Sequence, residues 1–238
     1  MQRYFAKVIN NQVILDDGDV HHLLHVMRAQ VGDQIEVVSD NHLYCAEVKS
    51  CSPLNIVVDY EIPSDSELPK EVTLFFALAK GDKIDFVVQK ATELGVKRIV
   101  LLKTQRCVTK FDNKDIEHKL ERYRKIAKEA SEQSHRLVVP EIVGVVDIKN
   151  IPSELLCDKN LIAYEKEAGK TTSLFNQLEG DYKSLSIFIG PEGGFLEAEV
   201  DNLVNKSNCQ LISLGKRILR TETAAVYALS VVGFYLEK

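Results

Sequence analysis

Residues 72–102 decide the fold, and they read VTLFFALAKGDKIDFVVQKATELGVKRIVLL. The stretch begins with an apolar run at Val72–Ala77 and continues with an amphipathic pattern over Asp82–Leu94, which ends at Gly95. It closes with a second apolar run at Arg98–Leu102. Apolar strands that alternate with helices are typical of a parallel sheet covered on both faces. The stretch therefore predicts an α/β fold.

The same alternation continues towards the end of the chain. A long charged helix is expected at about residues 112–135, and short apolar strands are expected at 161–164, 186–189 and 210–214. The last predicted helix, residues 222–236, is apolar almost all round. A helix without a polar face is buried on every side, so we expect this one to form a two-fold homodimer interface.

The beginning of the chain follows a different pattern. Short runs rich in Val, Ile and Tyr predict strands at 34–39, 42–50 and 54–62. One helix is expected at 20–29, with Asp19 as its N-cap. Closely spaced short strands with a single helix suggest a small β-barrel.

A linker is expected between these two patterns. Residues 63–69 contain two prolines and are otherwise mostly polar, with no hydrophobic periodicity. We therefore expect a first domain at 1–68 and a second at 69–238.

Charge is distributed unevenly along the chain. The net charge is -5, but residues 1–68 hold four Lys and Arg against eleven Asp and Glu, whereas residues 97–136 hold twelve against six. A chain with two oppositely charged parts can still hold phosphate on its basic side. A solvated helix surface would give the same pattern, so charge alone leaves a nucleic-acid partner open.

Composition excludes several other classes. No secretory signal follows Met1, and the longest mostly apolar stretch, 224–236, is shorter than the ~18–20 residues that cross a bilayer. We expect a cytoplasmic protein without a membrane partner. The five cysteines are scattered and form no CxxC pair, which argues against a disulfide framework and a zinc site. No metal is therefore expected.

Two loops follow predicted strands, where open α/β sheets bind ligands. The first is Gly190-Pro-Glu-Gly-Gly194, whose glycines permit positive φ and close approach to a ligand. A tight turn would explain them equally well, and the loop matches neither a P-loop nor a GxGxxG fingerprint. Another loop, Tyr164-Glu165, also follows a predicted strand, but its residues alone do not indicate a ligand.

The second informative loop is Gly215–Ala224, which reads GKRILRTETA. Thr221 can cap the helix that follows, and Glu222 suits the positive end of that helix. The loop also gathers three cations beside a helix start, which suits an anion or an electron-rich base. These are Lys216, Arg217 and Arg220.

These two loops, IGPEGGF and LGKRILRTETAA, resemble the RsmE family, the bacterial 16S rRNA (uracil-N3) methyltransferases of the SPOUT class. The agreement covers nearly the whole chain. It includes Arg3-Tyr-Phe, HHLLHVMR at 21–28, Lys80-Gly-Asp-Lys83, Gln89–Gly95, Glu132-Gln133 and Pro140-Glu-Ile142. The resemblance implies a SPOUT-type parallel sheet with a C-terminal trefoil knot, preceded by a small PUA-like β-barrel that binds RNA. It also implies S-adenosyl-L-methionine as the cofactor and 16S rRNA or the small ribosomal subunit as the partner.

The resemblance further implies roles for particular residues. Arg220 would stabilise the uracil anion. Glu222 would orient Arg220 or accept the proton, and Arg3 is a third catalytic candidate. The cofactor-binding candidates are Tyr164, Ile189, Gly190, Pro191, Glu192, Gly193, Gly194, Leu214, Gly215, Ile218 and Leu219. The RNA-contact candidates are Arg3, His22, Arg28, Arg106, Lys110 and Arg136.

Two alternatives stay open. Another SPOUT enzyme, acting on tRNA or on a ribose 2'-hydroxyl, would have similar loops, although the motif at residues 21–28 favours the ribosomal enzyme. A non-enzymatic RNA-binding ribosome-assembly factor would suit the first domain but not the two intact loops. A nucleotide-dependent dehydrogenase or kinase is disfavoured, because neither fingerprint follows the first strand of the sheet.

Overall fold

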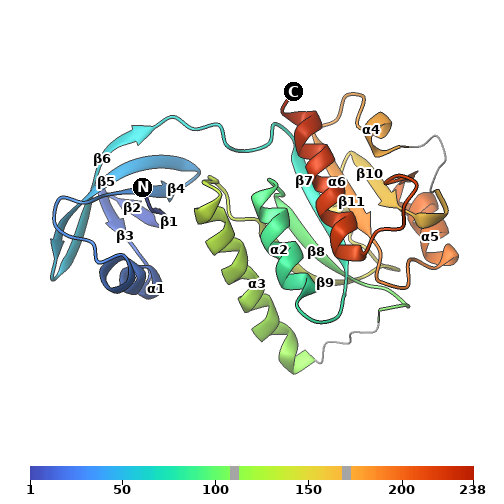
Figure 1. The fold of residues 1–238 in the computed structure, drawn as a ribbon, viewed down its shortest axis with the longest axis horizontal. Coiled ribbons are helices and arrows are strands. Elements are labelled where there is room, and N and C mark those ends of the chain that lie inside the picture. Colours follow the sequence, from blue (N-terminus) through green and yellow to red (C-terminus); the bar gives the residue numbers. More distant parts are fainter. Residues whose placement is uncertain (108–112, 168–172) are drawn as a thin grey trace. The chain divides into compact units, whose positions relative to one another are not determined.

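The computed structural model describes residues 1–107, 113–167 and 173–238, and its chain folds into two compact units (Figure 1). The first unit comprises Met1–Glu67 and Ser131–Val138, and the second comprises Leu68–Ala130 and Val139–Lys238. The expected domain boundary lies beside the division at Glu67. However, the eight residues from Ser131 to Val138, placed in the second domain from the sequence, group with the first unit.

The first unit is built on a six-stranded, mostly antiparallel sheet with the order β1-β4-β5-β6-β3-β2. Ala6 alone separates the first and last strands of this order, and its N–H donates to the carbonyl of Val38 in β4 at 3.0 Å. The chain thus passes from one edge of the sheet to the other, which curls the sheet into a barrel. The strands are β1 (Arg3–Phe5), β2 (Lys7–Ile9), β3 (Gln12–Ile14), β4 (Gln34–Ser39), β5 (His42–Cys51) and β6 (Leu54–Ile62).

The predicted strands β4 to β6 are confirmed, whereas the helix of this unit differs from its prediction. α1 (Asp17–His21) is capped by Asp16, whose carboxylate accepts from the N–H of Asp19 at 2.8 Å. The predicted cap, Asp19, is inside the helix, because Asp16 already has the extended backbone that a cap requires. The helix then widens into a π-helical turn at His22–Val26.

The second unit contains a six-stranded sheet in which every pairing is parallel, with the order β12-β10-β11-β7-β8-β9. After β9 the chain returns to the other side of β7, so the sheet has a switch in winding direction. Ligands bind beyond the carboxyl ends of strands in such sheets. The strands are β7 (Glu71–Ala77), β8 (Arg98–Lys103), β9 (Glu141–Asp147), β10 (Lys159–Ala163), β11 (Ser184–Ile189) and β12 (Cys209–Ile212).

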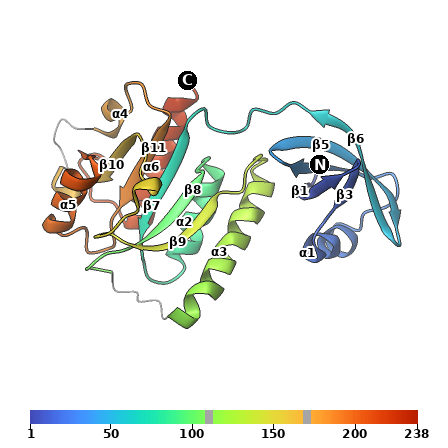
Figure 2. The same ribbon diagram turned by 180° about the vertical axis from the view of Figure 1, so that it is seen from behind.

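Helices cover both faces of this sheet, as the sequence predicted (Figures 1 and 2). Alternate residues of β7 point to opposite sides: Leu74 and Phe76 join one core with α2, α3 and α6, while Phe75 joins another with α5. The helices are α2 (Lys83–Glu93), α3 (Asn113–Gln133), α4 (Leu174–Gln177), α5 (Glu197–Ser207) and α6 (Thr221–Leu236), with short 3₁₀ turns at Ser153–Leu155 and Glu165–Glu167.

The last helix, α6, is not buried on every side within one chain. Ala225, Ala228 and Val232 pack in the core, whereas Phe234 is 77% exposed and Tyr227 is 43% exposed. Its outer face is therefore accessible, and it carries Thr223 and Ser230 beside these two aromatic side chains. Within the described residues, no helix is both long enough and apolar enough to span a membrane.

Candidate active site

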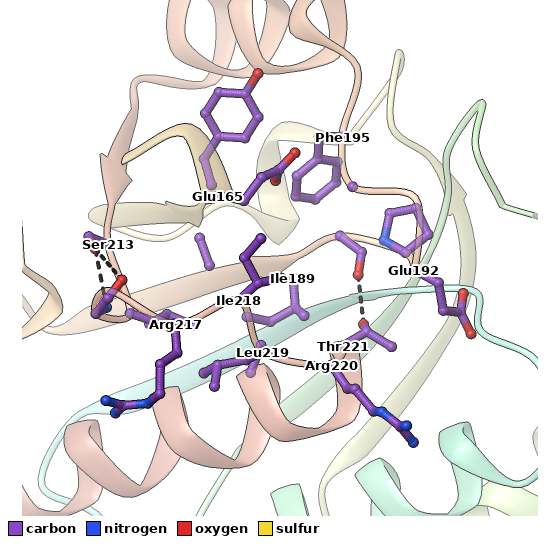
Figure 3. Close-up of a pocket in the computed structure, with 18 of the residues that line it drawn as sticks. Glu165, Ile189, Glu192, Phe195, Ser213, Arg217, Ile218, Leu219, Arg220 and Thr221 are labelled. Carbon is purple, nitrogen blue, oxygen red and sulfur yellow. Dashed lines mark hydrogen bonds between the residues drawn. The ribbon is translucent and has the colours of Figure 1, made fainter. Parts of the chain in front are cut away.

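A cavity of about 390 Å³ opens at the carboxyl ends of β10, β11 and β12 (Figure 3). It lies where the switch in winding direction places a ligand site, and its volume lies in the range of small-molecule sites. The residues that line it come from the loops after these three strands and from the starts of α2 and α6. They are Lys83, Ala163, Tyr164, Glu165, Ile189, Gly190, Pro191, Glu192, Gly194, Phe195, Ser213, Leu214, Gly215, Arg217, Ile218, Leu219, Arg220, Thr221 and Ala224.

The loop after β11, residues 190–194, forms a tight glycine turn. Gly194 has φ +68, and a Cβ added there would come within 2.7 Å of Oε1 of Glu165. Only glycine therefore leaves the Glu165 carboxylate in its observed place at the cavity wall (Figure 3). The turn itself closes through a hydrogen bond from the N–H of Gly194 to the carbonyl of Pro191 at 2.8 Å.

The loop after β12 is joined to this glycine turn by one hydrogen bond. The hydroxyl of Thr221 donates to the carbonyl of Gly190 at 2.6 Å. Thr221 was expected to cap α6, but Arg220 occupies the N-cap position without a side-chain cap, and Thr221 is the first helical residue. Its hydroxyl connects two loops instead of closing one helix.

Arg106 supports the glycine turn from the outside. Its Nη1 donates to the carbonyl of Gly193 at 2.6 Å, and its side chain lies 3.4 Å from the position that a Cβ on that glycine would take. Arg106 was predicted as a phosphate contact, but the structure places its guanidinium on the loop that lines the cavity. Lys110, the neighbouring candidate, lies outside the described residues.

A charged cluster occupies the rim beside α2. Nζ of Lys83 lies 2.9 Å from Oε1 of Glu192 and 3.5 Å from Oε2 of Glu222. The hydrogen bond to Glu192 raises the pKa of Lys83. Burial alone would raise the pKa of Glu192, but the hydrogen bonds from Lys83 and from backbone N–H groups outweigh it and lower that pKa overall. Both groups are charged at neutral pH.

Arg220 lines the cavity and is exposed. Within the described parts of the chain, no residue pairs with its guanidinium, and in Figure 3 that group points away from the guanidinium of Arg217. Glu222 lies just after it, with its side chain 19% exposed. An unpaired cation at a cavity rim is available to an anionic or electron-rich ligand.

Most of the predicted cofactor-binding residues meet around this one cavity. All of them line it except Gly193, which faces Arg106. Sequence reasoning assigned no site role to Lys83, Phe195 or Ser213. The ring of Phe195 packs 3.2 Å from the position that a Cβ on Gly190 would take, and Ser213 accepts from the N–H of Gly215 at 3.1 Å. Phe195 directly follows the glycine turn and Ser213 begins the loop after β12, so their positions in the sequence could have indicated that they line the site.

Two of the predicted RNA contacts are buried within the first unit. Arg3 is 4% exposed and binds Glu36 at 2.8 Å, and it also donates to the carbonyls of His135 and Arg136. Arg136 is 2% exposed and forms a bidentate pair with Glu67. Neither guanidinium faces solvent, and both are held by partners within the first unit. RNA contact by Arg3 and Arg136, and catalysis by Arg3, stay predictions that would require these side chains to leave their partners.

The other candidates of the first unit remain accessible. His22 is half-buried and shares a hydrogen bond of 2.9 Å between its Nδ1 and the hydroxyl of Tyr4. Arg28 is exposed and has φ +56 at the end of the π-helical turn. The exposed side chains of Val26, Met27 and Val31 surround it in the sequence. This turn therefore presents a cation among apolar groups.

Comparison with known proteins gives the family. The RNA methyltransferase domain family matches residues 66–233, and the RNA methyltransferase PUA domain family matches residues 15–59. The ribosomal RNA small subunit methyltransferase E of Bacillus subtilis is 37% identical over 251 residues, which covers 100% of this chain and 98% of that protein. The protein of the same name from Rickettsia conorii is 30% identical, over 92% of this chain and 88% of its own.

Solved structures agree with this result. The crystal structure of a ribosomal RNA small subunit methyltransferase E from Neisseria gonorrhoeae bound to S-adenosyl methionine superposes with a TM-score of 0.84 at 28% identity, covering 98% of this chain and 97% of that one. Both family matches, the relatives and the fold point to the same group of proteins. The chain belongs to the ribosomal RNA small subunit methyltransferase E family, and it combines a PUA domain with an RNA methyltransferase domain.

Proposed function

We propose that this enzyme transfers a methyl group from S-adenosyl-L-methionine to N3 of a uridine in 16S rRNA. One observation carries the proposal. The glycine turn and the loop after β12, which carries Arg217 and Arg220, line the same cavity and are joined by the hydrogen bond from Thr221 to Gly190. A cation, Arg220, stands at the rim of that cavity. The names of the relatives support ribosomal RNA of the small subunit as the substrate.

The cavity suits the chemistry of this cofactor. The aliphatic side chains of Ile189, Leu214 and Leu219 provide an apolar wall that fits an adenine ring. The carboxylates of Glu165 and Glu192 line the cavity and suit the ribose hydroxyls or the positive charges of S-adenosyl-L-methionine. Ile218 is 85% exposed at the rim, where a bound molecule would cover it. When bound, the cofactor supplies an activated methyl group.

The side chains of the enzyme then deal with the charge of the acceptor. N3 of uracil carries a weakly acidic proton, so the ring gains negative charge as that proton leaves, and the charge is used up as the N3–C bond forms. Arg220 is exposed, unpaired among the described residues, and permanently charged, so it can stabilise that anion. Glu222 lies beside it and can accept the proton. These roles are assigned to residues of one chain and need no metal.

Methyl transfer to purified substrates tests the proposal. Tritiated S-adenosyl-L-methionine is incubated with the enzyme and with 30S particles, free 16S rRNA or tRNA, and the modified nucleoside is identified by mass spectrometry. We expect 3-methyluridine in 16S rRNA. Methylation of tRNA or of a ribose hydroxyl would favour another SPOUT activity. Failure to bind S-adenosyl-L-methionine in calorimetry would favour a ribosome-assembly factor.

We assign RNA binding to the first domain, residues 1–68, and catalysis to the second, residues 69–238. Arg28 is exposed beside the half-buried His22, and both stay RNA-contact candidates. Because phosphate contacts release counterions, affinity for RNA should fall steeply with salt concentration. A flat salt dependence would contradict the phosphate-contact argument. A ribosomal substrate would also support a cytoplasmic location for the enzyme.

We propose two further features. The C-terminal part of the chain is proposed to form a trefoil knot, which would shorten the contour length released when the chain is pulled from its two ends. The outer face of α6, with the exposed aromatic side chains of Tyr227 and Phe234, is proposed to form a two-fold homodimer. A single-chain mass in light scattering at micromolar concentration would contradict the dimer.

A further inference from the structure

Lys83 connects the loops after three strands of the second unit. It is the first residue of α2, just beyond the loop after β7, and it lines the cavity. Its Nζ lies 2.9 Å from Glu192 of the glycine turn and 3.5 Å from Glu222 at the start of α6. The backbone N–H of Lys80 donates to the same oxygen of Glu192 at 3.3 Å. The ammonium group of Lys83 thus lies between Glu192 of the glycine turn and Glu222, the proposed proton acceptor.

The carboxylate of Glu222 lies within ion-pair distance of this ammonium. Its Oε2 is inaccessible to solvent and has no hydrogen-bond partner among the described residues, while Lys83 is its ion-pair partner. Burial disfavours a charged carboxylate, and a nearby cation favours it. The charged groups on the surrounding elements include Lys80 and Asp82 before α2, Asp85 in its first turn, Glu192 in the glycine turn, and Arg217 and Arg220 before α6. Lys83 is the cation placed within ion-pair distance of the Glu222 carboxylate among the described residues.

Lys83 cannot itself take the proton. Its pKa is raised, chiefly by the hydrogen bond with Glu192, so it stays protonated at neutral pH. A residue that remains a cation can hold a carboxylate in place before and after that carboxylate is protonated. When Glu222 takes up a proton, the pair of Lys83 with Glu192 remains, and no uncompensated cation is left at the rim.

We propose that Lys83 is a positioning residue for methyl transfer, which keeps Glu222 ionised beside Arg220 and ties it to the glycine turn through Glu192. This inference rests on the proposed uridine methylation. In that reaction the S–C bond of the methyl donor breaks, the N3–C bond forms, and the N3 proton passes to Glu222. The sulfur leaves as a neutral thioether, so charge and electrons balance without another reactant.

The test compares K83M with the conservative variant K83R and the matched control K90M. Lys90 lies on the same helix, and its side chain is 34% exposed compared with 30% for Lys83, but its partner is Glu93, away from the cavity. For K83M we expect kcat to fall by about 10²-fold. We also expect the acidic limb of the kcat–pH profile to move up by about one unit or more. K83R should recover most of the activity, and K90M should match the wild type.

A second readout needs neither RNA nor cofactor. The carboxyl ¹³C resonance of Glu222, assigned by its loss in E222Q, gives the pKa of this group directly. K83M should raise it relative to the wild type and K90M. An unchanged pKa would overturn the inference, and so would an unshifted pH profile with equal losses in cofactor affinity and kcat/KM. If the wild type forms no 3-methyluridine while K83M still moves the titration, the proposed function has failed and the link between Lys83 and Glu222 stands.

Discussion

The hydroxyl of Thr221 donates a hydrogen bond of 2.6 Å to the carbonyl of Gly190, and this contact joins two loops that lie 31 residues apart in the sequence. One loop supplies backbone groups to the cavity, and the other supplies Arg220. A change in either loop is therefore transmitted to the other. The hydroxyl at position 221 therefore links the loop beside the proposed cofactor site to the loop that carries the proposed catalytic cation.

Removing this hydroxyl should weaken cofactor binding. In T221V the carbonyl of Gly190 loses its donor at nearly constant side-chain volume, which costs about 1 kcal/mol for a partly buried hydrogen bond. We expect the Kd for S-adenosylhomocysteine to rise about fivefold in calorimetry. T221S keeps the donor and should bind like the wild type. Equal affinities for all three proteins would show that the bond does not shape the cavity.

Substituting Gly194 should displace a carboxylate. In G194A the new Cβ would come within 2.7 Å of Oε1 of Glu165, and φ +68 strains any residue except glycine. We expect S-adenosylhomocysteine affinity to fall about tenfold or more, which corresponds to ~1.4 kcal/mol. G32A is the matched control, since Gly32 has φ +94 but no atom within 4 Å of its added Cβ. It should lose some stability and no affinity.

Replacing Arg106 separates its two possible roles. In R106M the carbonyl of Gly193 loses a hydrogen bond of 2.6 Å, so the glycine turn loosens. We expect weaker S-adenosylhomocysteine binding, by about 1–2 kcal/mol for a bond to a charged donor that is partly exposed. The measurement is calorimetry without RNA. Normal cofactor binding together with a reduced salt slope for RNA would instead restore the phosphate contact.

Breaking the Arg3 pair should unfold the first unit more readily. R3M leaves Glu36 and two backbone carbonyls without their donor in a buried place, and such losses cost about 3–5 kcal/mol. Thermal or urea unfolding should show the drop in stability. R28M, at an exposed position, should keep the wild-type stability and lose affinity for RNA. The opposite pattern would support Arg3 as an RNA contact.

Much of the α/β unit could be predicted from hydrophobic pattern, because its strands are continuous apolar runs and α2 ends at Gly95. The three-residue strands β1 to β3 were missed, since three residues are too few to show a period. The edge strand β9 was also missed; Gly144 interrupts it with φ +107 near a shift in register.

The site was predictable where chemistry repeats a family motif and unpredictable where it depends on tertiary packing. The glycine turn and the loop after β12 were both predicted from the sequence as ligand-binding loops, and both line the cavity. The burial of Arg3 and Arg136 could not be read from the sequence, because their partners Glu36 and Glu67 lie 33 and 69 residues away. Distant carboxylates decide whether an arginine faces solvent.

The assignment of Ser131–Val138 to the first unit has a consequence for the order in which the protein is made. Arg3 leaves the ribosome early, yet the carbonyl of His135 that it binds follows 132 residues later. The barrel of a nascent chain therefore lacks its last contacts until more than half of the polypeptide has been translated. A nascent chain halted soon after residue 67 would expose Arg3 and Glu67 without all of their native partners, so the folding of this small domain is timed by the synthesis of the larger one.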